Sequence, residues 1–281
     1  MQDLQTFINV ISAKRNIHIS ILDLSGMLNT ELTRLSFDSV IHSKPICDVA
    51  KSTPCGFRTC LRCKSLANLK AREGKAFSGL CAYGIFELAY PVMLSGEVGA
   101  VIYVGNALKD ERESIRRLER TCKKTGVDSE RMRGLFAECE RIGDSNELLS
   151  VAEAVADHLL ITYERAGERM LDGHWLVLAL KKHAADSCRT SLSIKELAKI
   201  YQKNEKYLGR LFKKEVGIGF HEYCNKIRLK RAKKLIESTD KKIIDIAIEC
   251  GFDNVSYFNR IFVREYGRSP SQYRSSTRVN A

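Results

Sequence analysis

The chain has 281 residues, of which 44% are hydrophobic and 28% are charged, and only four are proline. This composition is typical of a folded globular protein and excludes collagen-like, low-complexity and disordered classes. The length suits two domains of about 100 to 200 residues each. No apolar stretch reaches the ~18 to 20 residues of a membrane helix, and the N-terminus lacks the basic flank and apolar run of a signal peptide. We therefore expect a cytoplasmic protein that does not use a membrane.

The net charge of +12 comes entirely from the C-terminal part of the chain. Residues 1–172 hold 23 Lys and Arg and 23 Asp and Glu, whereas residues 173–281 hold 23 against 11. Scattered solvated charges do not account for a surplus confined to one region. This distribution predicts a polyanionic partner, and nucleic acid is the most common one.

The N-terminal part mixes strand and helix patterns, which predicts an α+β core. A strand is expected over residues 17–24, and a hairpin over 86–94 and 98–104, across the turn Ser95-Gly96-Glu97. A helix is expected from 110 to about 124, followed by a long helical stretch from 145 to about 185.

The long helical stretch carries an apolar stripe at alternating steps of four and three residues. Its members are Leu148, Ala152, Val155, Leu159 and Thr162. Such a stripe could pair two subunits, or it could pack back onto the core of its own domain. Both interpretations stay open from sequence.

An internal repeat occupies the last ninety residues. Tyr207, Arg210, Phe212, Glu215, Gly217 and Tyr223 recur fifty residues later as Tyr257, Arg260, Phe262, Glu265, Gly267 and Tyr273. Each copy reads as a short helix, a turn and a longer helix, so the repeat predicts two helix-turn-helix units.

The first unit is expected to open with a capping box. Ser193 and Glu196 begin a helix over 194–200, and Asn204 caps the next helix. Helical spacing places Tyr207 or Leu208, Leu211 and Phe212 inward and leaves outward the set Lys206, Gly209, Arg210, Lys213 and Lys214.

The second unit follows the same pattern. Asp240 precedes a helix over 243–250, and Asp253 or Asn254 caps a helix whose outward face carries Val255, Ser256, Asn259 and Arg260. Arg can bind guanine and Asn can bind adenine through two hydrogen bonds in the major groove. These faces therefore carry the donors and acceptors that base reading requires.

A connector helix of 18 residues, about 27 Å long, is expected between the two units, over 220–237. Its inward face would carry Phe220, Tyr223, Ile227 and Leu235. Its basic residues are expected to be solvated or to contact phosphates; they are Lys226, Arg228, Lys230, Arg231, Lys233 and Lys234.

Residues 191–275 resemble the DNA-binding domain of the AraC/XylS family of transcriptional regulators. The matching motifs are Ile246-Ala247, Gly251-Phe252, Tyr257-Phe258, Arg260, Phe262, Gly267, Ser269-Pro270 and Tyr273. The resemblance implies an all-α domain with two helix-turn-helix units that binds double-stranded promoter DNA. It implies base-facing positions at Lys206, Gly209, Arg210, Val255, Ser256, Asn259 and Arg260. Two residues of the first unit depart from the family pattern. Gln202 stands where the family usually has a small residue or glycine in the turn, and Gly209 has no side chain to contact a base.

Five of the ten cysteines lie within 35 residues, at Cys47, Cys55, Cys60, Cys63 and Cys81. The Cys60-x-x-Cys63 pair with Cys47 and Cys81 would suit a four-sulfur site for zinc or an iron–sulfur cluster, and Cys55 could substitute for Cys47. Arg58, Arg62 and Lys64 would offset the thiolate charge. The alternative is a group of free buried cysteines.

Residues 42–106 resemble the PocR sensory domain, a PAS-like ligand-binding module found ahead of regulators of small-alcohol metabolism. The matching residues are 42–47, Cys60 with Cys63, Cys81, Gly84, Glu87, Pro91 and the hairpin over 96–105. The resemblance implies a small-molecule pocket, which Tyr83, Phe86, Glu87 and Tyr103 could line. Three of them also have a simpler explanation: core packing for Phe86 and Tyr103, and a surface charge for Glu87. His42 alone is more simply an ordinary histidine than a ligand.

Together these features predict a PAS-like α+β sensor over 1–144, a helical linker over 145–187 and a double helix-turn-helix domain over 188–281. The expected function is a ligand-responsive, sequence-specific transcription regulator, acting as an activator on promoter DNA under a small-molecule effector. RNA polymerase and a second copy of this chain stay open as further partners. The alternatives are an iron–sulfur or thiol redox sensor and, less favoured, a zinc-thiolate DNA alkyl-transfer enzyme, whose pattern needs two close cysteine pairs. Hydrolase and nucleotide-binding motifs are lacking, so no enzyme is expected.

Overall fold

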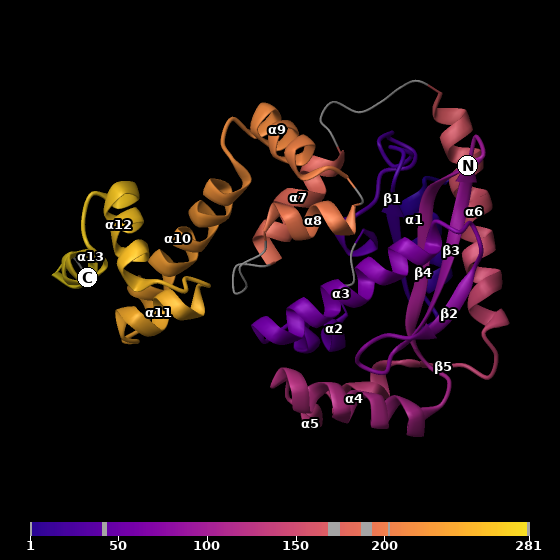
Figure 1. The fold of residues 1–281 in the computed structure, drawn as a ribbon, viewed down its shortest axis with the longest axis horizontal. Coiled ribbons are helices and arrows are strands. Elements are labelled where there is room, and N and C mark those ends of the chain that lie inside the picture. The colour runs from indigo at the N-terminus through magenta and orange to yellow at the C-terminus, as the bar shows by residue number, and fades with distance from the viewer. Residues whose placement is uncertain (1, 41–43, 168–174, 187–192, 202, 280–281) are drawn as a thin grey trace. The chain divides into compact units, whose positions relative to one another are not determined.

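The computed structural model describes residues 2–40, 44–167, 175–186, 193–201 and 203–279 (Figure 1). The chain forms two compact units, Met1–Ala179 with Ala198–Lys203, and Leu180–Leu197 with Asn204–Ala281. The predicted boundary at 187/188 lies outside the described residues, as do His42 and Gln202.

The first unit is built on a five-stranded sheet with its longest strand in the centre. That strand, β4 (Glu97–Leu108), pairs antiparallel with β1 (His18–Asp23) and with β3 (Phe86–Leu94). The outer strand β2 (Phe77–Leu80) pairs with β3, and the short β5 (Glu140–Arg141) runs parallel to the end of β4. The order is thus β1-β4-β3-β2.

The predicted hairpin is confirmed as β3 and β4. Ser95 and Gly96 form its turn with φ of 51° and 84°, as a tight two-residue hairpin loop requires. β4 continues beyond the predicted end at 104 to Leu108, because its residues from Gly99 onward are buried and its last residues gain a further partner in the short strand β5.

One face of the sheet is covered by α1 (Leu4–Ser12) and α6 (Asn146–Ala166). Every member of the apolar stripe on α6 is at most 2% exposed, and its apolar members join the core with strand residues such as Ile102 and Val104. The stripe packs onto its own sheet, which confirms the second of the two interpretations. The predicted separate linker over 145–187 is therefore corrected at its start, since α6 belongs to the first unit.

The first unit contains further helices before and after its strands. They are η1 (Phe37–Ser39), α2 (Pro45–Ala50), α3 (Pro54–Ala71), α4 (Glu111–Thr125), α5 (Ser129–Gly134) and η2 (Leu135–Glu138). α3 contacts β3 and β4. The predicted helix over 110–124 is confirmed as α4, which Asp110 caps by accepting the Glu113 N–H and which ends at Gly126 in the left-handed region.

The described C-terminal part is entirely helical. Its elements are α7 (Trp175–Asp186), α8 (Ile194–Ile200), α9 (Glu205–Val216), α10 (Phe220–Ser238), α11 (Ile243–Glu249), α12 (Val255–Tyr266) and α13 (Pro270–Val279). α8 has the predicted bounds, the predicted connector and the helix over 243–250 match α10 and α11 within one residue, and α12 begins directly after Asn254, one of its two predicted caps. The coarse prediction of an α+β unit followed by a helical one is confirmed.

The sequence repeat is also a structural repeat. Phe212 and Phe262 are both fully buried, and each meets its partner tyrosine, Tyr223 or Tyr273, edge to face at 5.3 and 5.8 Å between ring centroids. Asn204 and Asn254 cap α9 and α12 with their side chains, and Gly217 and Gly267 end them with φ of 82° and 72°.

The buried face of α10 differs from the predicted one. Phe220 is buried as expected, but Tyr223, Ile227 and Leu235 are only half-buried. The deeper positions are Cys224, Asn225, Arg228, Leu229, Ala232 and Ile236. Arg228, expected among the solvated charges, is 7% exposed with its guanidinium 5.8 Å from the Phe252 ring. The buried face is thus shifted by about one residue, and Leu229, Ala232 and Ile236 join the core to which α11 and α12 also contribute.

Candidate sensor cavity and nucleic-acid interface

The face of the sheet opposite α6 holds a cavity of about 160 Å³. Successive strand residues point to opposite faces, so Tyr103 and Gly105 of β4 line the cavity whereas Ile102 and Val104 belong to the core. α2, α3 and the residues after β2 complete the wall. An engineered cavity of roughly 150 Å³ holds one benzene molecule, so the volume of this cavity corresponds to a molecule of about that size.

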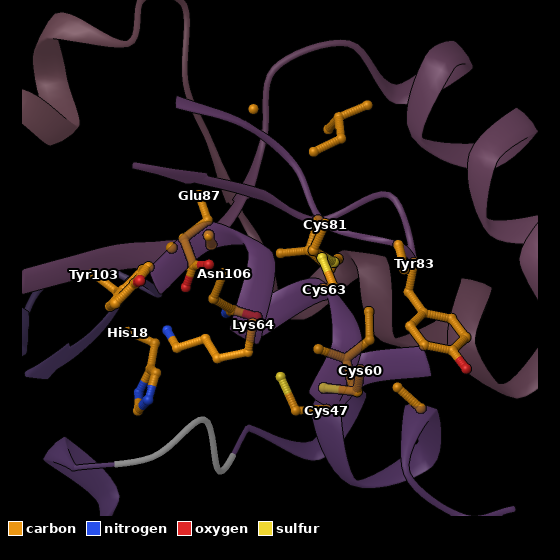
Figure 2. A pocket seen from close by; sticks show the side chains of 18 of the residues that line it. His18, Cys47, Cys60, Cys63, Lys64, Cys81, Tyr83, Glu87, Tyr103 and Asn106 are labelled. Carbon is orange, nitrogen blue, oxygen red and sulfur yellow. The ribbon is translucent and has the colours of Figure 1, made fainter. Parts of the chain in front are cut away.

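One end of the cavity is polar. Figure 2 shows Lys64, Glu87, Tyr103, His18 and Asn106 on one side of it. The Lys64 ammonium lies 2.9 Å from the centre of the Tyr103 ring. Burial lowers the pKa of Lys64, and the nearby Glu87 carboxylate opposes that shift. A cation and an anion thus lie together at this end of the cavity.

Side chains at the polar end of the cavity are held in place by contacts with other protein groups. The Tyr103 hydroxyl donates to the Asn68 side-chain oxygen, and burial raises the pKa of Tyr103. The Asn106 amide donates to the carbonyl oxygens of Asn16 and Glu138 at 2.6 and 3.1 Å. Gly105 leaves room for Glu87, because a Cβ there would lie 3.1 Å from the Glu87 Cγ. The polar end is therefore fixed before any ligand arrives.

The other end carries the four clustered cysteines, Cys47, Cys60, Cys63 and Cys81 (Figure 2). Burial raises the pKa of the Cys47 thiol to about 12 and also raises those of Cys60 and Cys81. A buried thiol that keeps its proton behaves as a small, soft, apolar group. At neutral pH these three thiols are therefore an apolar wall of the cavity.

The described residues contain no group of three or more His, Cys, Asp or Glu side chains arranged to hold a metal ion. The four cysteines share a cavity but, as placed, do not form a metal-binding set. Cys55, the predicted substitute for Cys47, is exposed near the start of α3 and does not line the cavity. Zinc or an iron–sulfur cluster at these residues stays a prediction.

Three of the four predicted ligand residues, Tyr83, Glu87 and Tyr103, line the cavity. Phe86 instead packs in the core on the α6 face, because it alternates with Glu87 along β3. Sequence reasoning missed His18, Asn106 and Lys64 as lining residues. Lys64 was treated as a flanking charge, although its position four residues after Cys60 on one helix places both on the same face.

The predicted base-facing residues lie on α9 and α12. Lys206 and Arg210 on α9 are exposed, as are Ser256, Asn259 and Arg260 on α12. Gly209 is half-buried, and a Cβ added to it would lie 3.8 Å from the Ile194 Cδ1. Val255 is half-buried against the core of the second helix-turn-helix unit. The two predicted positions without a polar side chain are thus the two least exposed.

The arginines of the two copies are held differently. The Arg260 guanidinium lies 5.4 Å from the centre of the Tyr257 ring, one turn earlier on α12. The Arg210 Nε donates instead to the Lys206 carbonyl oxygen at 3.4 Å. Equivalent residues of the repeat therefore present their charge in different surroundings.

The family model described as the sensory domain found in PocR matches residues 1–160, more than half of the chain. The chain belongs to the PocR sensory-domain family. A helix-turn-helix domain model matches residues 197–276 behind this PocR domain. Both resemblances seen in the sequence, to PocR and to AraC-type DNA-binding domains, are confirmed.

Curated relatives match about a third of this chain. The uncharacterized HTH-type transcriptional regulator YijO of Escherichia coli (strain K12) is 36% identical over 96 residues, 34% of each chain. The HTH-type transcriptional activator RhaR of Klebsiella pneumoniae is 36% identical over 78 residues, 28% of each chain. The match thus spans about a third of the length of these curated relatives.

Among solved structures, the C-terminal domain of AraT, a response regulator from Geobacillus stearothermophilus, is 31% identical. The match covers 36% of this chain and 84% of that one, with a TM-score of 0.35. In the described part of the chain, no helix is both long enough and apolar enough to cross a membrane.

Proposed function

We propose that the chain is a ligand-responsive, sequence-specific DNA-binding transcription regulator that acts as an activator. The observation that carries the proposal is the pair of matched helices α9 and α12, whose exposed faces present Lys206, Arg210, Asn259 and Arg260. These side chains offer the donors and acceptors that read bases in the major groove. An activator would also contact RNA polymerase at its promoter, and a second copy could bind beside the first.

The cavity of the PocR domain supports the sensing role. Its volume limits the effector to roughly the size of benzene, its protonated thiols favour an apolar part, and its polar end favours one polar group. Because Lys64 and Glu87 oppose each other in charge, an uncharged effector avoids leaving either one unbalanced in a buried space. The proposed effector is therefore a small uncharged molecule with one polar end.

Signalling follows as a population shift. An effector that fits one conformation of the sensor better than another favours that conformation by no more than its difference in affinity for the two. DNA binding changes only if the two conformations also differ in how they present the helix-turn-helix units. The effector and the operator must therefore each change the affinity for the other by the same factor.

The test combines selection of DNA with a blocked cavity. Purified protein would first enrich its binding sites from random duplexes, and thermal shifts would then screen short alcohols, ketones and amides. Ala67→Leu fills the cavity and should abolish the thermal shift and the change in DNA affinity while leaving basal DNA binding intact. Ala76→Leu, at an exposed position outside the cavity, is the control. Failure to enrich any sequence would overturn the DNA-reading role.

A thiol- or metal-based sensor with the same DNA reader is the second candidate, favoured by the four cysteines that line one cavity. Metal analysis and an absorption spectrum of anaerobically purified protein test it, beside Cys60→Ser/Cys63→Ser. One tightly bound metal per chain that is lost in the variant would support this candidate. Metal-free, colourless protein would rule out its metal form.

A further inference from the structure

A buried asparagine links the connector helix to the second reading helix. Asn225 of α10 is 4% exposed. Its amide nitrogen donates to the Tyr257 hydroxyl oxygen at 2.9 Å and to the His221 Nδ1 at 3.3 Å. Both amide hydrogens thus have acceptors, one on its own helix and one on α12, which fixes the end of the Tyr257 side chain.

Tyr257 in turn supports Arg260. The phenol ring lies one turn before Arg260 on α12, with the guanidinium 5.4 Å from the ring centre. This is the range in which a cation is attracted to an aromatic face. A long arginine side chain loses rotamer freedom when it binds a base, so a ring that already restricts it lowers the cost of binding.

The first copy of the repeat lacks this arrangement. Tyr207 is 44% exposed, and in the described residues its hydroxyl has no hydrogen-bond partner. Arg210 lies against the backbone of Lys206. The position fifty residues before Asn225 is Trp175, on α7, outside the first helix-turn-helix unit. The repeat therefore contains an internal comparison, with the same Tyr and Arg but without the asparagine.

We propose that Asn225 is a positioning residue for DNA recognition, which acts through Tyr257 to set how selectively Arg260 reads its base pair. Asn225 is buried, so it has no direct contact with DNA. This inference rests on the proposed function, because it assigns a role within the reading face of α12. It predicts that a change inside the protein alters base preference at one position of the operator.

The experiment uses the full chain and duplexes enriched by the wild type from a random library. Tyr257→Phe removes the hydroxyl that Asn225 binds and keeps the ring, Asn225→Ala removes the other partner, and Tyr257→Leu removes the ring. Each should lower the ratio of specific to non-specific affinity by roughly two- to fivefold, the size of an exposed cation–π contact. Selection with each variant should show relaxed preference at one base pair only. Tyr207→Phe is the matched control and should change neither.

Combination with Arg260→Ala decides the route. If Asn225 acts through Arg260, Tyr257→Phe has no further effect on the ratio in the Arg260→Ala background. An undiminished effect there would overturn the proposal, as would an equal loss of specific and non-specific affinity or the same change from Tyr207→Phe. Should Asn225→Ala fail to fold, Tyr257→Phe decides alone. If the wild type enriches no sequence, the proposed function itself fails, and this inference fails with it.

Discussion

Arg260 is the residue for which the structure gives the most specific prediction about DNA binding. It is exposed on α12, and the Tyr257 ring holds it at one side. We expect Arg260→Ala to weaken binding to an enriched duplex by about 1 to 3 kcal/mol, since a two-bond contact to guanine is lost. Titrations with enriched and random duplexes measure this. Lys230→Ala, on the exposed side of α10, should weaken both by the same factor; the same pattern for Arg260→Ala would show that it contacts phosphate only.

Cys139 is a single residue that should make the stability of the fold depend on pH. It is 5% exposed, its Sγ lies 3.6 Å from the Asn106 Oδ1, and burial raises its pKa to about 11 from the usual 9.0. Well below pH 9 the thiol is protonated in both folded and unfolded chains. Between about 9 and 11 the unfolded chain loses the proton first, so stability falls as pH rises.

Urea unfolding at about pH 8 and about pH 10.5 measures this effect. Other groups titrate in the same range, so the comparison is with Cys139→Ala, whose stability should fall less between the two values. An identical fall in wild type and variant would mean that the Cys139 thiol ionises as readily in the folded protein as in the unfolded one.

At the scale of elements, α6 shows how one apolar stripe can be used. Leu159 is fully buried against the sheet, whereas Ile161, two residues on, is 44% exposed. Leu159→Ala should reduce the free energy of unfolding by about 2 to 5 kcal/mol through the cavity it leaves. Ile161→Ala should change it by less than about 0.5 kcal/mol. Chemical denaturation measures both, with light scattering as a check on oligomeric state. A Leu159→Ala protein that changes oligomeric state at unchanged stability would contradict the packing described here.

At the scale of the whole molecule, the N-terminal and C-terminal parts of the chain differ in net charge. Residues 173–281 carry the entire surplus of +12, so non-specific DNA affinity should fall steeply with salt. The slope of log K against log salt is about −0.9 for each phosphate neutralised. Lys230→Ala should make the slope less steep by about one unit. Fluorescence titrations at several salt concentrations give the slope; a flat dependence would show that the basic surplus does not contact the DNA backbone.

The sequence by itself determined the features that arise from local interactions. The bounds of α8, the caps Asn204 and Asn254 and the glycine ends of α9 and α12 depend on residues within one turn of each other. The repeat and the charge surplus are likewise properties of the chain and needed no fold. For the same reason the exposure of Lys206, Arg210, Asn259 and Arg260 followed from helical spacing alone.

Only the tertiary structure decided which side chains meet across elements. Helical spacing could not show that α10 buries Asn225 and Arg228, because the buried face depends on what packs against it. Spacing could place Lys64 on the same helix face as Cys60 and could place Phe86 opposite Glu87. It could not show which of these faces lines the cavity, since that depends on how α3 crosses the sheet and on the register of β3. Burial is a property of partners distant in sequence, and it sets both the chemistry of the cavity and the support of Arg260.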